Sequence, residues 1–472
     1  MIFSSFDFLF RFLPVFLFLY FACPERHRNL CLFAGSLAFY FYGVKDNPLY
    51  FLLFAVSIAV NFQVGALIGR RNRGAARGRW LAVGVAYNLF WLLLFKYSAF
   101  FAENLNQMFA LLKVGVTLPV YRPALPIGIS FYTFQAIAYL ADVYRREAKY
   151  ERSFVNFGMY LGMFPHLISG PIVRYPDEAE EISGRGLSAG MVESGLRELT
   201  IGLGYKVLIA DRLGGLWSQV GAIGYDSIST PLAWMGAAAY SLQLYFDFCG
   251  YSLMAVGLGR ILGFELPQNF ATPYMSLSMT EFWRRWHITL GSWFRDYVYI
   301  PLGGNRRGTA VMLRNMLAVW LLTGFWHGAS WNFLFWGLTL FVLMTLEKLG
   351  LARLFHRVPA LGHLYMMLAI PLTWMIFAIG DPGQLAVYFQ RLFPFLEGGK
   401  DVMYFAGDYL KYGRLYGISL AAGLIFMTGW PRRLYDRYRN TLVTAVILLA
   451  VFWISVYCIQ MGENDPFLYF SF

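Results

Sequence analysis

The chain has 472 residues, of which 58% are hydrophobic, 19% aromatic and only 14% charged. Because a soluble globular domain carries about 25% charged residues, this composition excludes an ordinary soluble protein. Lys and Arg number 39 against 27 Asp and Glu, which gives a net charge of +12. We see no basic soluble module that would carry this charge to DNA or RNA, so a nucleic-acid partner is not expected.

Several almost uncharged stretches approach the length of about 20 residues that a transmembrane helix needs. They are Leu49–Ile68, Leu81–Leu94, Trp234–Tyr245, Leu364–Ile379 and Leu442–Tyr457. We therefore predict an all-α, polytopic integral membrane protein whose main surroundings are the lipid bilayer. Neither a linker nor a clear internal repeat divides the chain, so a single transmembrane domain is expected over residues 1–472.

Basic residues cluster between the apolar stretches, at Arg26–Arg28, Arg70–Arg79, Arg145–Arg152 and Arg432–Arg439. Positive charge beside a transmembrane helix favours the cytoplasmic face. Two spans separate the first cluster from the second, which predicts an N-terminus outside the cell. The four cysteines have no C-x-x-C spacing and are expected to be buried free thiols.

In the first half of the chain, Asp7 and Arg11 are four residues apart and predict an ion pair on a tilted or interfacial helix. The mixed polar and apolar segment 102–123 is expected to be interfacial or re-entrant. Further helices are expected at 29–43, 49–69, 80–101 and 125–146.

Two prolines and a glycine around His166 predict a helix break inside segment 154–173. The acidic segment 174–190 is expected to be a solvated turn. Segment 191–213 is a half-polar helix that cannot cross lipid alone. Later helices are expected at 330–346 and 361–380, at the short amphipathic 382–394, and on both sides of 431–440.

The apolar segment 237–264 carries Asp247 at its centre. An ionisable group within a span is a functional hypothesis by default, because burying a charge in lipid is expensive. Asp247 therefore either supports a site or pairs with a structural Arg.

Residues 278–328 hold the densest set of polar groups in this apolar chain. Ser278 and Glu281 have the S-x-x-E spacing of a capping box, which predicts one helix from Ser278 towards Pro301. On that helix one stripe would be aromatic and another polar. The aromatic stripe is Trp283, Trp286, Leu290, Trp293 and Tyr297, and the polar one is Arg284, His287, Gly291 and Arg295.

Forty residues after His287, His327 ends a very apolar segment in the sequence FWHGA. A His in a dry site can act as the general base that activates a hydroxyl. Gly324 and Gly328 would allow close backbone approach, while Trp326 and Trp331 would exclude water. The alternative for a single His is a hydrogen-bonded, aromatic-packed residue at a helix end.

The second His in the same neighbourhood favours chemistry over a structural role. Glu281, Arg284, Arg285 and Asp296 add charges that are costly at membrane depth. Two His and a carboxylate could also bind zinc, but the chain has no H-E-x-x-H motif and 40 residues separate the pair. We therefore expect no metal. The two arginines could position an anionic donor or pair with Glu281.

Five segments together resemble the membrane-bound O-acyltransferase family, more narrowly its bacterial branch that acetylates exported polysaccharides such as alginate. They are PIGISFYTFQ (126–135), FPHLISGPI (164–172), QLYFDFCGYS (243–252), EFWRRWHITLGSWFRDYVYIPLGGNR (281–306) and FWHG (325–328). The opening MIFSSFDFLFRFLPVFL and the closing PFLYFSF are similar to that branch as well.

The resemblance implies roughly 11 transmembrane helices with re-entrant or interfacial helices around a central funnel, and a catalytic core at about 125–350. It maps the family's catalytic His onto His327 and its second His onto His287. Acetyl-CoA would be the donor substrate, with no bound cofactor, and an extracytoplasmic acetyltransferase partner would pass acetyl to the polysaccharide. Substrate contacts are expected from Glu281, Arg284, Arg285, Trp286, Trp326 and Asp247.

These expectations describe an O-acyltransferase of the bacterial inner membrane that serves an exported polysaccharide or cell-wall polymer. The alternative in another class is a transporter or exporter subunit of a polysaccharide secretion complex, for which inverted repeats would be expected. A structural subunit of such a complex is the third possibility, and the two histidines count against it.

Overall fold

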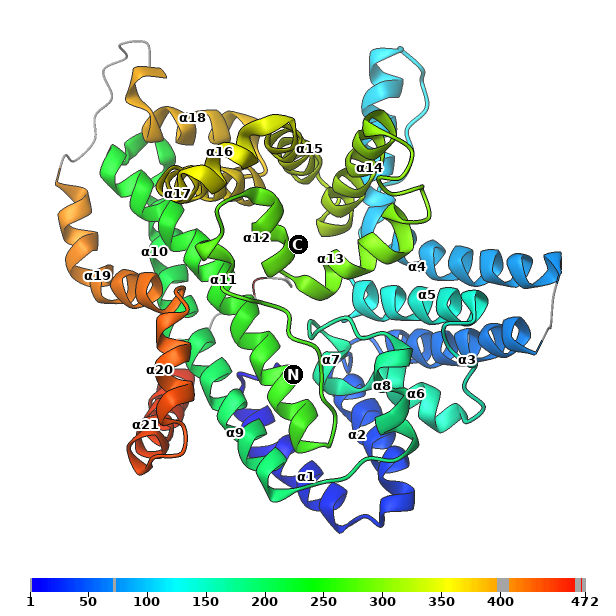
Figure 1. Ribbon diagram of the computed structural model, residues 1–472. Helices are drawn as coiled ribbons and strands as arrows, with labels where there is room; N and C mark the ends of the chain where they lie inside the picture. Colours follow the sequence, from blue (N-terminus) through cyan, green and yellow to red (C-terminus); the bar gives the residue numbers. More distant parts are fainter. Residues whose placement is uncertain (1, 71–73, 397–406, 463–467, 469–472) are drawn as a thin grey trace. The chain divides into compact units, whose positions relative to one another are not determined.

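A computed structural model describes residues 2–70, 74–396, 407–462 and Leu468. Within these ranges every regular element is a helix (Figure 1), so the predicted all-α architecture is confirmed. The chain divides into two compact units, each of which is described by itself. Unit 1 is Met1–Leu196 with Ala255–Pro267, and unit 2 is Arg197–Met254 with Gln268–Phe472. The single transmembrane domain stays a prediction.

Among the described residues, six helices are long and apolar enough to cross a bilayer. They are Leu49–Gly69, Ala75–Leu111, Thr309–His327, Trp331–Arg357, Pro359–Ala378 and Leu442–Gln460. A multi-pass protein is thereby supported, whereas the count of roughly 11 is not confirmed. Long helices with polar faces, such as α11 (Thr230–Ile261), do not enter a count that is based on apolarity.

Unit 1 contains the N-terminal helices and the short helices that follow them. They are η1 (Asp7–Phe12), α1 (Leu13–Ala22), α2 (Arg28–Gly43), α3 (Leu49–Gly69), α4 (Ala75–Leu111), α5 (Ile129–Arg145), α6 (Phe154–Gly162), α7 (Phe164–Leu167) and α8 (Tyr175–Ser183). Helices α3, α4 and α5 pack side by side, and α2 packs on α6 (Figure 1). The expected pair of Asp7 and Arg11 is present at 2.6 Å.

Helix α4 runs further than the sequence predicts. Its last ten residues belong to the segment 102–123, so the interfacial or re-entrant piece expected there is in part a regular helix. The remainder folds back along α4, because the side chain of Asn106 accepts from the amide of Leu118 (2.7 Å) and donates to its carbonyl oxygen (2.9 Å).

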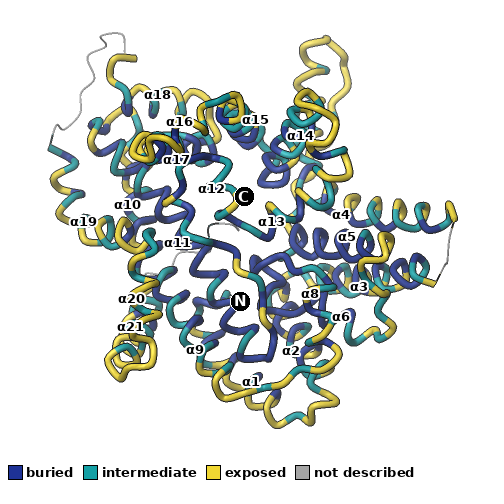
Figure 2. The backbone as a smooth tube through the Cα atoms, in the orientation of Figure 1, coloured by how far each residue is buried: buried dark blue, intermediate teal, exposed yellow. Residues whose placement is uncertain are grey.

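Helix α5 is buried along most of its length, and Figure 2 draws it dark blue there. Its Gln135 side chain lies 3.0 Å from Nδ1 of His166. The helix break predicted around His166 is confirmed, because Met163 separates α6 from α7 with extended backbone and α7 ends at Leu167. Both polar side chains of this pair are fully buried.

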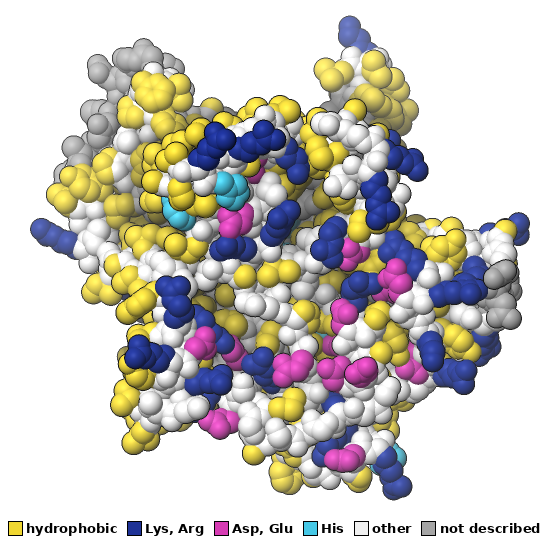
Figure 3. Space-filling view, in the orientation of Figure 1, with side chains coloured by type: hydrophobic (Ala, Val, Ile, Leu, Met, Phe, Trp, Pro, Cys, Tyr) yellow, Lys and Arg dark blue, Asp and Glu magenta, His cyan; other side chains and the backbone are white. Residues whose placement is uncertain are grey.

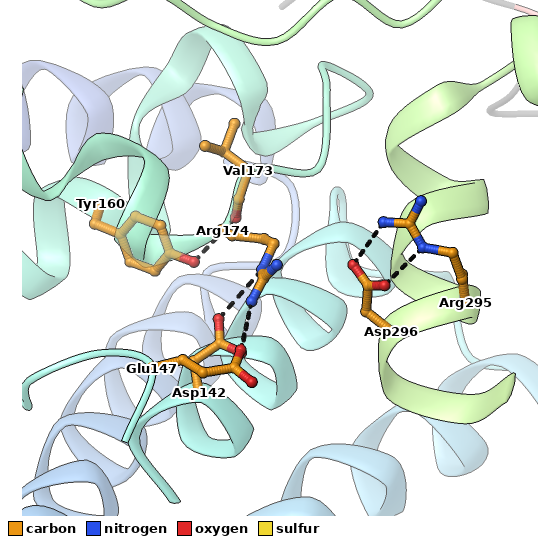
Figure 4. A network of polar contacts seen from close by, with 7 residues as sticks. All are labelled: Asp142, Glu147, Tyr160, Val173, Arg174, Arg295 and Asp296. Carbon is orange, nitrogen blue, oxygen red and sulfur yellow. Dashed lines mark hydrogen bonds and ion pairs between the residues drawn. The ribbon is translucent and has the colours of Figure 1, made fainter. Parts of the chain in front are cut away.

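The solvated turn predicted for 174–190 is wrong, because α8 forms over Tyr175–Ser183 with a proline in its first turn. Glu178 on α8 is only 2% exposed. Burial, together with Glu181 and Asp177 nearby, raises the pKa of this carboxyl well above its usual range. Figure 4 shows how Arg174, just before α8, holds the same region through ion pairs with Asp142 (3.1 Å) and Glu147 (2.9 Å).

Two helices cross the boundary between the units, α9 from unit 1 into unit 2 and α11 from unit 2 into unit 1. The half-polar helix expected at 191–213 is α9 (Ala189–Gly204), which passes through the π-helical η3 (Tyr205–Ala210) into α10 (Asp211–Ile223). The span expected at 237–264 is α11. The other helices of unit 2 are α12 (Met279–Arg285), α13 (Ile288–Phe294), η6 (Arg295–Tyr299), α14 (Thr309–His327), α15 (Trp331–Leu346), η7 (Glu347–Leu351), α16 (Ala352–Arg357), α17 (Pro359–Ala378), α18 (Pro382–Leu392), α19 (Asp408–Phe426), α20 (Trp430–Tyr438) and α21 (Leu442–Gln460).

Within unit 2, α15 packs on both α14 and α17, and the part of α11 in this unit is mostly buried. By contrast, α21 has a mean hydropathy of 2.6 but is only 11% buried, and Figure 2 shows it mostly exposed. An apolar helix with so little protein cover is suited to lipid. Of the closing PFLYFSF segment, only Leu468 lies within the described residues. The cysteines are free as expected, although only Cys249 is fully buried.

Candidate active site

The segment that carries His287 is not the single helix that the sequence predicts. Helix α12 begins as expected, because the Ser278 side chain accepts from the amide of Glu281 (3.1 Å), but it ends at Arg285. His287 has φ 44° and ψ 54°, a left-handed conformation that costs most L-residues about 1–2 kcal/mol. The helix towards Pro301 and its two side-chain stripes are therefore wrong, since α13 leaves in a new direction.

A neighbouring segment explains why the helix stops there. The amide of Ala271 donates to the carbonyl oxygen of Arg285 (2.9 Å), and the amide of Ile288 donates to that of Asn269 (3.0 Å). These bonds replace helical hydrogen bonds on both sides of His287, so the break leaves its backbone groups paired. Local capping signals gave no information about this distant partner.

The surroundings of His287 determine which ring nitrogen carries the proton. The imidazole is 2% exposed, and its Nδ1 lies 3.1 Å from Oδ1 of Asn269. The same oxygen accepts from the Thr289 amide (3.3 Å) and hydroxyl (3.0 Å), which fixes the orientation of the Asn269 side chain because an amide N–H can only donate. Nδ1 therefore donates, and Nε2 keeps its lone pair and can act as a base.

His327 is held at the C-terminal end of α14 by aromatic rings. It is 7% exposed, and its ring packs edge-on against Trp336 (5.1 Å between centroids) and Phe377 (5.3 Å). The close approach expected at Gly324 is confirmed, because a Cβ there would overlap the carbonyl oxygen of Phe333. Backbone contact between α14 and α15 thus sets the position of His327.

Trp326 brings the two histidines into one neighbourhood. Its indole lies 5.0 Å from the ring of His327 and 6.3 Å from that of His287. The water-excluding role predicted for Trp331 is wrong, since that side chain is 54% exposed. Phe248 shields His287 instead, with its ring 4.6 Å away in a T-shaped arrangement. Two imidazoles thus share a buried aromatic shell.

Trp286 lies at the C-terminal end of α12 inside a larger aromatic cluster. Its ring is 5.1 Å from Trp374 and 5.5 Å from the stacked ring of Phe282. With 4% exposure, it supports the wall of the site from behind. Contact between Trp286 and a substrate stays a prediction.

Asp247 is part of a buried charge cluster. Its Oδ1 lies 2.9 Å from Nζ of Lys206, which also pairs with Asp211 at 2.5 Å, and its Oδ2 accepts from the amide of Leu468 (2.8 Å). The structural partner is therefore a Lys rather than the expected Arg. Sequence reasoning missed Lys206, although its place in a half-polar helix was the available signal. A direct role of Asp247 in substrate binding stays a prediction.

The two neighbouring arginines differ in their partners. Arg285 pairs with Glu281 at 2.5 Å, while the second carboxylate oxygen of Glu281 accepts from the Leu277 amide (2.8 Å). Arg284 is exposed and lines a cavity of about 380 Å³. Asp296 pairs with the adjacent Arg295 (2.7 Å), as Figure 4 shows.

Within the ranges that the structure describes, no group of three or more His, Cys, Asp or Glu side chains is arranged to hold a metal ion. The arrangement at His287 and His327 instead offers an unprotonated imidazole nitrogen that is buried among aromatic side chains. Such a nitrogen can remove a proton from a hydroxyl.

Comparison with known proteins agrees with this chemistry. The sequence model of the membrane-bound O-acyltransferase family (MBOAT) matches residues 87–379. A probable alginate O-acetylase of Pseudomonas putida is 35% identical over 502 aligned positions, covering 100% of both chains. That of Pseudomonas aeruginosa is 41% identical, covering 80% of this chain and 72% of its own. A peptidoglycan O-acetyltransferase of Helicobacter pylori is 37% identical, covering 70% of this chain and 67% of its own.

Proposed function

The chain belongs to the membrane-bound O-acyltransferase family, and on this premise we propose that it carries acetyl from cytoplasmic acetyl-CoA across the inner membrane for O-acetylation of an exported polysaccharide. It is a multi-pass membrane O-acyltransferase. Family membership favours this enzyme class over the transporter alternative. Relatives named as alginate and peptidoglycan O-acetylating proteins support acetyl as the acyl group and a polymer outside the cell as its destination.

The main observation behind the proposal is that two histidine rings pack against the same indole, that of Trp326. His287 lies in the break between α12 and α13 and His327 ends α14, yet both rings pack against Trp326 in a buried aromatic shell. A base inside such a shell is protected from water, which would otherwise hydrolyse the acyl donor. The family's catalytic role maps onto His327, and His287 is the hydrogen-bonding or proton-relay partner.

In the proposed step, His327 removes the proton of an acceptor hydroxyl. The hydroxyl oxygen attacks the acetyl carbonyl carbon, the new C–O bond forms, and the C–S bond of the donor breaks. The leaving thiolate takes up the proton that the imidazole had accepted, so atoms and charge balance. His287 supports this transfer through Nε2, whose lone pair is fixed by the Asn269 contact.

The direction of transfer follows from the positive-inside rule. Basic clusters on the cytoplasmic side place the N-terminus outside and the donor inside. The acceptor is then reached from the opposite face, either as the polymer itself or through an extracytoplasmic acetyltransferase partner. Alginate, cellulose and a cell-wall polymer share the hydroxyl chemistry that this site requires.

The decisive experiment is His327→Ala in cells that export the polymer. Loss of a positioned general base typically lowers a rate by about 10²–10⁴-fold, so polymer-linked acetyl per unit of membrane protein should fall to background. His287→Ala should reduce acetylation by less if His287 orients or relays. The matched control is His363→Ala, since His363 is in the same unit but outside the aromatic shell.

Membrane levels and thermal stability in detergent must be equal across the three variants for the comparison to count. Normal acetylation in the His327 variant would refute its catalytic role. If polymer export were lost while acetylation per polymer stayed unchanged, the result would favour the exporter alternative.

A further inference from the structure

A second polar site lies beside the first turn of α12, outside the aromatic shell. It is a cavity of about 380 Å³, within the range of about 300–1,000 Å³ found for small-ligand pockets. We name it the α12–α16 pocket, and it is lined by Ser278, Thr280, Glu281, Arg284, Glu347, Lys348, Ala352 and His356. All of these residues belong to unit 2.

The two carboxylates of this pocket already have partners within the protein. Glu347 is 2% exposed, and its oxygens accept from the amides of Met279 (2.5 Å) and Thr280 (3.0 Å) and from the Thr280 hydroxyl (2.9 Å). Glu281 is bound by Arg285 and by the amide of Leu277. Glu281 is therefore neutralised by Arg285, whereas Glu347 is held by neutral donors and leaves one negative charge beside the pocket.

The basic groups of the pocket have no such partners. Within the described part of the chain, Arg284, Lys348 and His356 make no hydrogen bond or ion pair, and all three are exposed. Figure 3 shows Lys, Arg and His side chains gathered over α12 and α16. Arg284 and Lys348 together outweigh the charge of Glu347, which leaves a net positive charge that favours an anion.

The pocket lies at one end of a candidate membrane span. Glu347, Lys348 and His356 close the apolar helix Trp331–Arg357, and α17 starts two residues later as the next candidate span. The turn between two spans lies at a membrane surface, where phosphate groups of lipids and of soluble metabolites are both accessible. Arg284 can bind two phosphate oxygens at once through its planar fork.

We infer that the α12–α16 pocket binds one phosphate group of an anionic ligand through Arg284, Lys348 and His356. A phosphate suits three donors because it offers more acceptor oxygens than a carboxylate does, and a phosphate monoester also carries a larger charge. The group can come from an anionic phospholipid headgroup or from a water-soluble phosphate ester such as CoA. The inference does not rest on acyl transfer, since binding and acetylation are measured separately.

The test uses the full chain, purified in a neutral detergent. Two probes are titrated while the melting temperature is followed. One is phosphatidylglycerol, with diacylglycerol as its phosphate-free control, and the other is CoA, with phosphate-free pantetheine as its control. Lys348→Gln and Arg284→Gln should each weaken saturable binding of the phosphate-bearing probe by about tenfold, as expected for loss of one charge-assisted hydrogen bond.

The matched control is Arg353→Gln, which removes one exposed positive charge from α16 without lining the pocket. Lys348→Arg should restore binding, which distinguishes a lost donor from a misfolded variant. Phosphatidylglycerol binding alone would identify a lipid site, and CoA binding would identify a soluble phosphate ligand. Equal weakening by Arg353→Gln, or no saturable binding of either probe, would overturn the inference.

Discussion

Asn269 shows how much of this site depends on a single oxygen atom. Its Oδ1 accepts from Nδ1 of His287 and from the amide and the hydroxyl of Thr289. One side chain therefore orients the imidazole and connects it to the start of α13. Asn269 does not touch the reacting atoms in the proposed step. It is a positioning residue, and its effect should be visible in the protonation of His287.

We predict that Asn269→Asp is active at high pH. As the pH falls, this variant should lose activity earlier, that is at a higher pH, than the parent does. The carboxylate still accepts from Nδ1, yet its negative charge favours the protonated imidazole, and a protonated Nε2 cannot act as a base. Asn269→Leu removes the acceptor and should lower acetylation at every pH, with a loss of stability of about 1–3 kcal/mol from unpaired buried donors.

The measurement is acetylation of the polymer in membrane vesicles across a pH series. Parallel pH profiles in the parent and Asn269→Asp would show that Asn269 has only a structural role. The histidines could be found from the sequence because ionisable groups are rare in so apolar a chain. Asn269 could not, because it lies 18 residues away in a segment without regular structure.

At the scale of elements, glycine contacts determine how the helices carry the site. Helices α14 and α15 approach until the backbone of each meets a glycine of the other. A Cβ on Gly324 would overlap the carbonyl oxygen of Phe333, and one on Gly337 would overlap that of Trp320. Since these obstacles are backbone atoms, side-chain rotation cannot relieve them.

We therefore predict that Gly324→Ala forces α14 and α15 apart, displaces His327 from Trp336 and Phe377, and lowers both the melting temperature and acetylation. The matched control is Gly417→Ala on α19, where a Cβ would meet nothing within 4 Å. That variant should be neutral, or more stable by up to about 1 kcal/mol, because Ala is the better helix former. The measurement is a comparison of the melting curves of the purified variants. A stable and active Gly324→Ala protein would contradict the prediction.

The element boundaries show where sequence reasoning succeeds and where it fails. The start of α12 at Ser278 and the break at Met163 were predictable, because capping and helix-breaking residues act locally. The break at His287 was not predictable, because the hydrogen bonds that replace the helix come from residues 269–271. Helix α8 was missed for another reason. Its acidic composition suggested a solvated segment, although one face of the helix, with Glu178, is buried.

For the whole molecule, composition was sufficient to predict an all-α membrane protein but not to count its spans. Six helices satisfy length and apolarity, whereas α5 has only 17 residues and α11 carries buried polar residues such as Asp247. Hydropathy alone cannot tell whether such a helix crosses the membrane or lies at its surface. Orientation must therefore be measured.

We predict that a cysteine introduced at Ala75 resists a membrane-impermeant thiol reagent in intact cells, whereas one introduced at Lys45 reacts. Both positions are exposed and flank α3, so they report opposite faces of one candidate span. The four native cysteines are first replaced by serine or alanine in an active background. Labelling at Ala75 but not at Lys45 would reverse the proposed orientation and the direction of acetyl transfer.

The carboxylate of Glu347 has a mechanical consequence. Glu347 directly follows α15, and its carboxylate accepts from the first two amides of α12. Helix α15 in turn packs closely on α14 through glycine contacts. The chain of contacts from His327 to the helix that precedes His287 is therefore short and stiff. Any motion that admits a substrate has to displace the two imidazoles together, as parts of one rigid frame, and a hinge that opens the site must lie outside α12, α14 and α15.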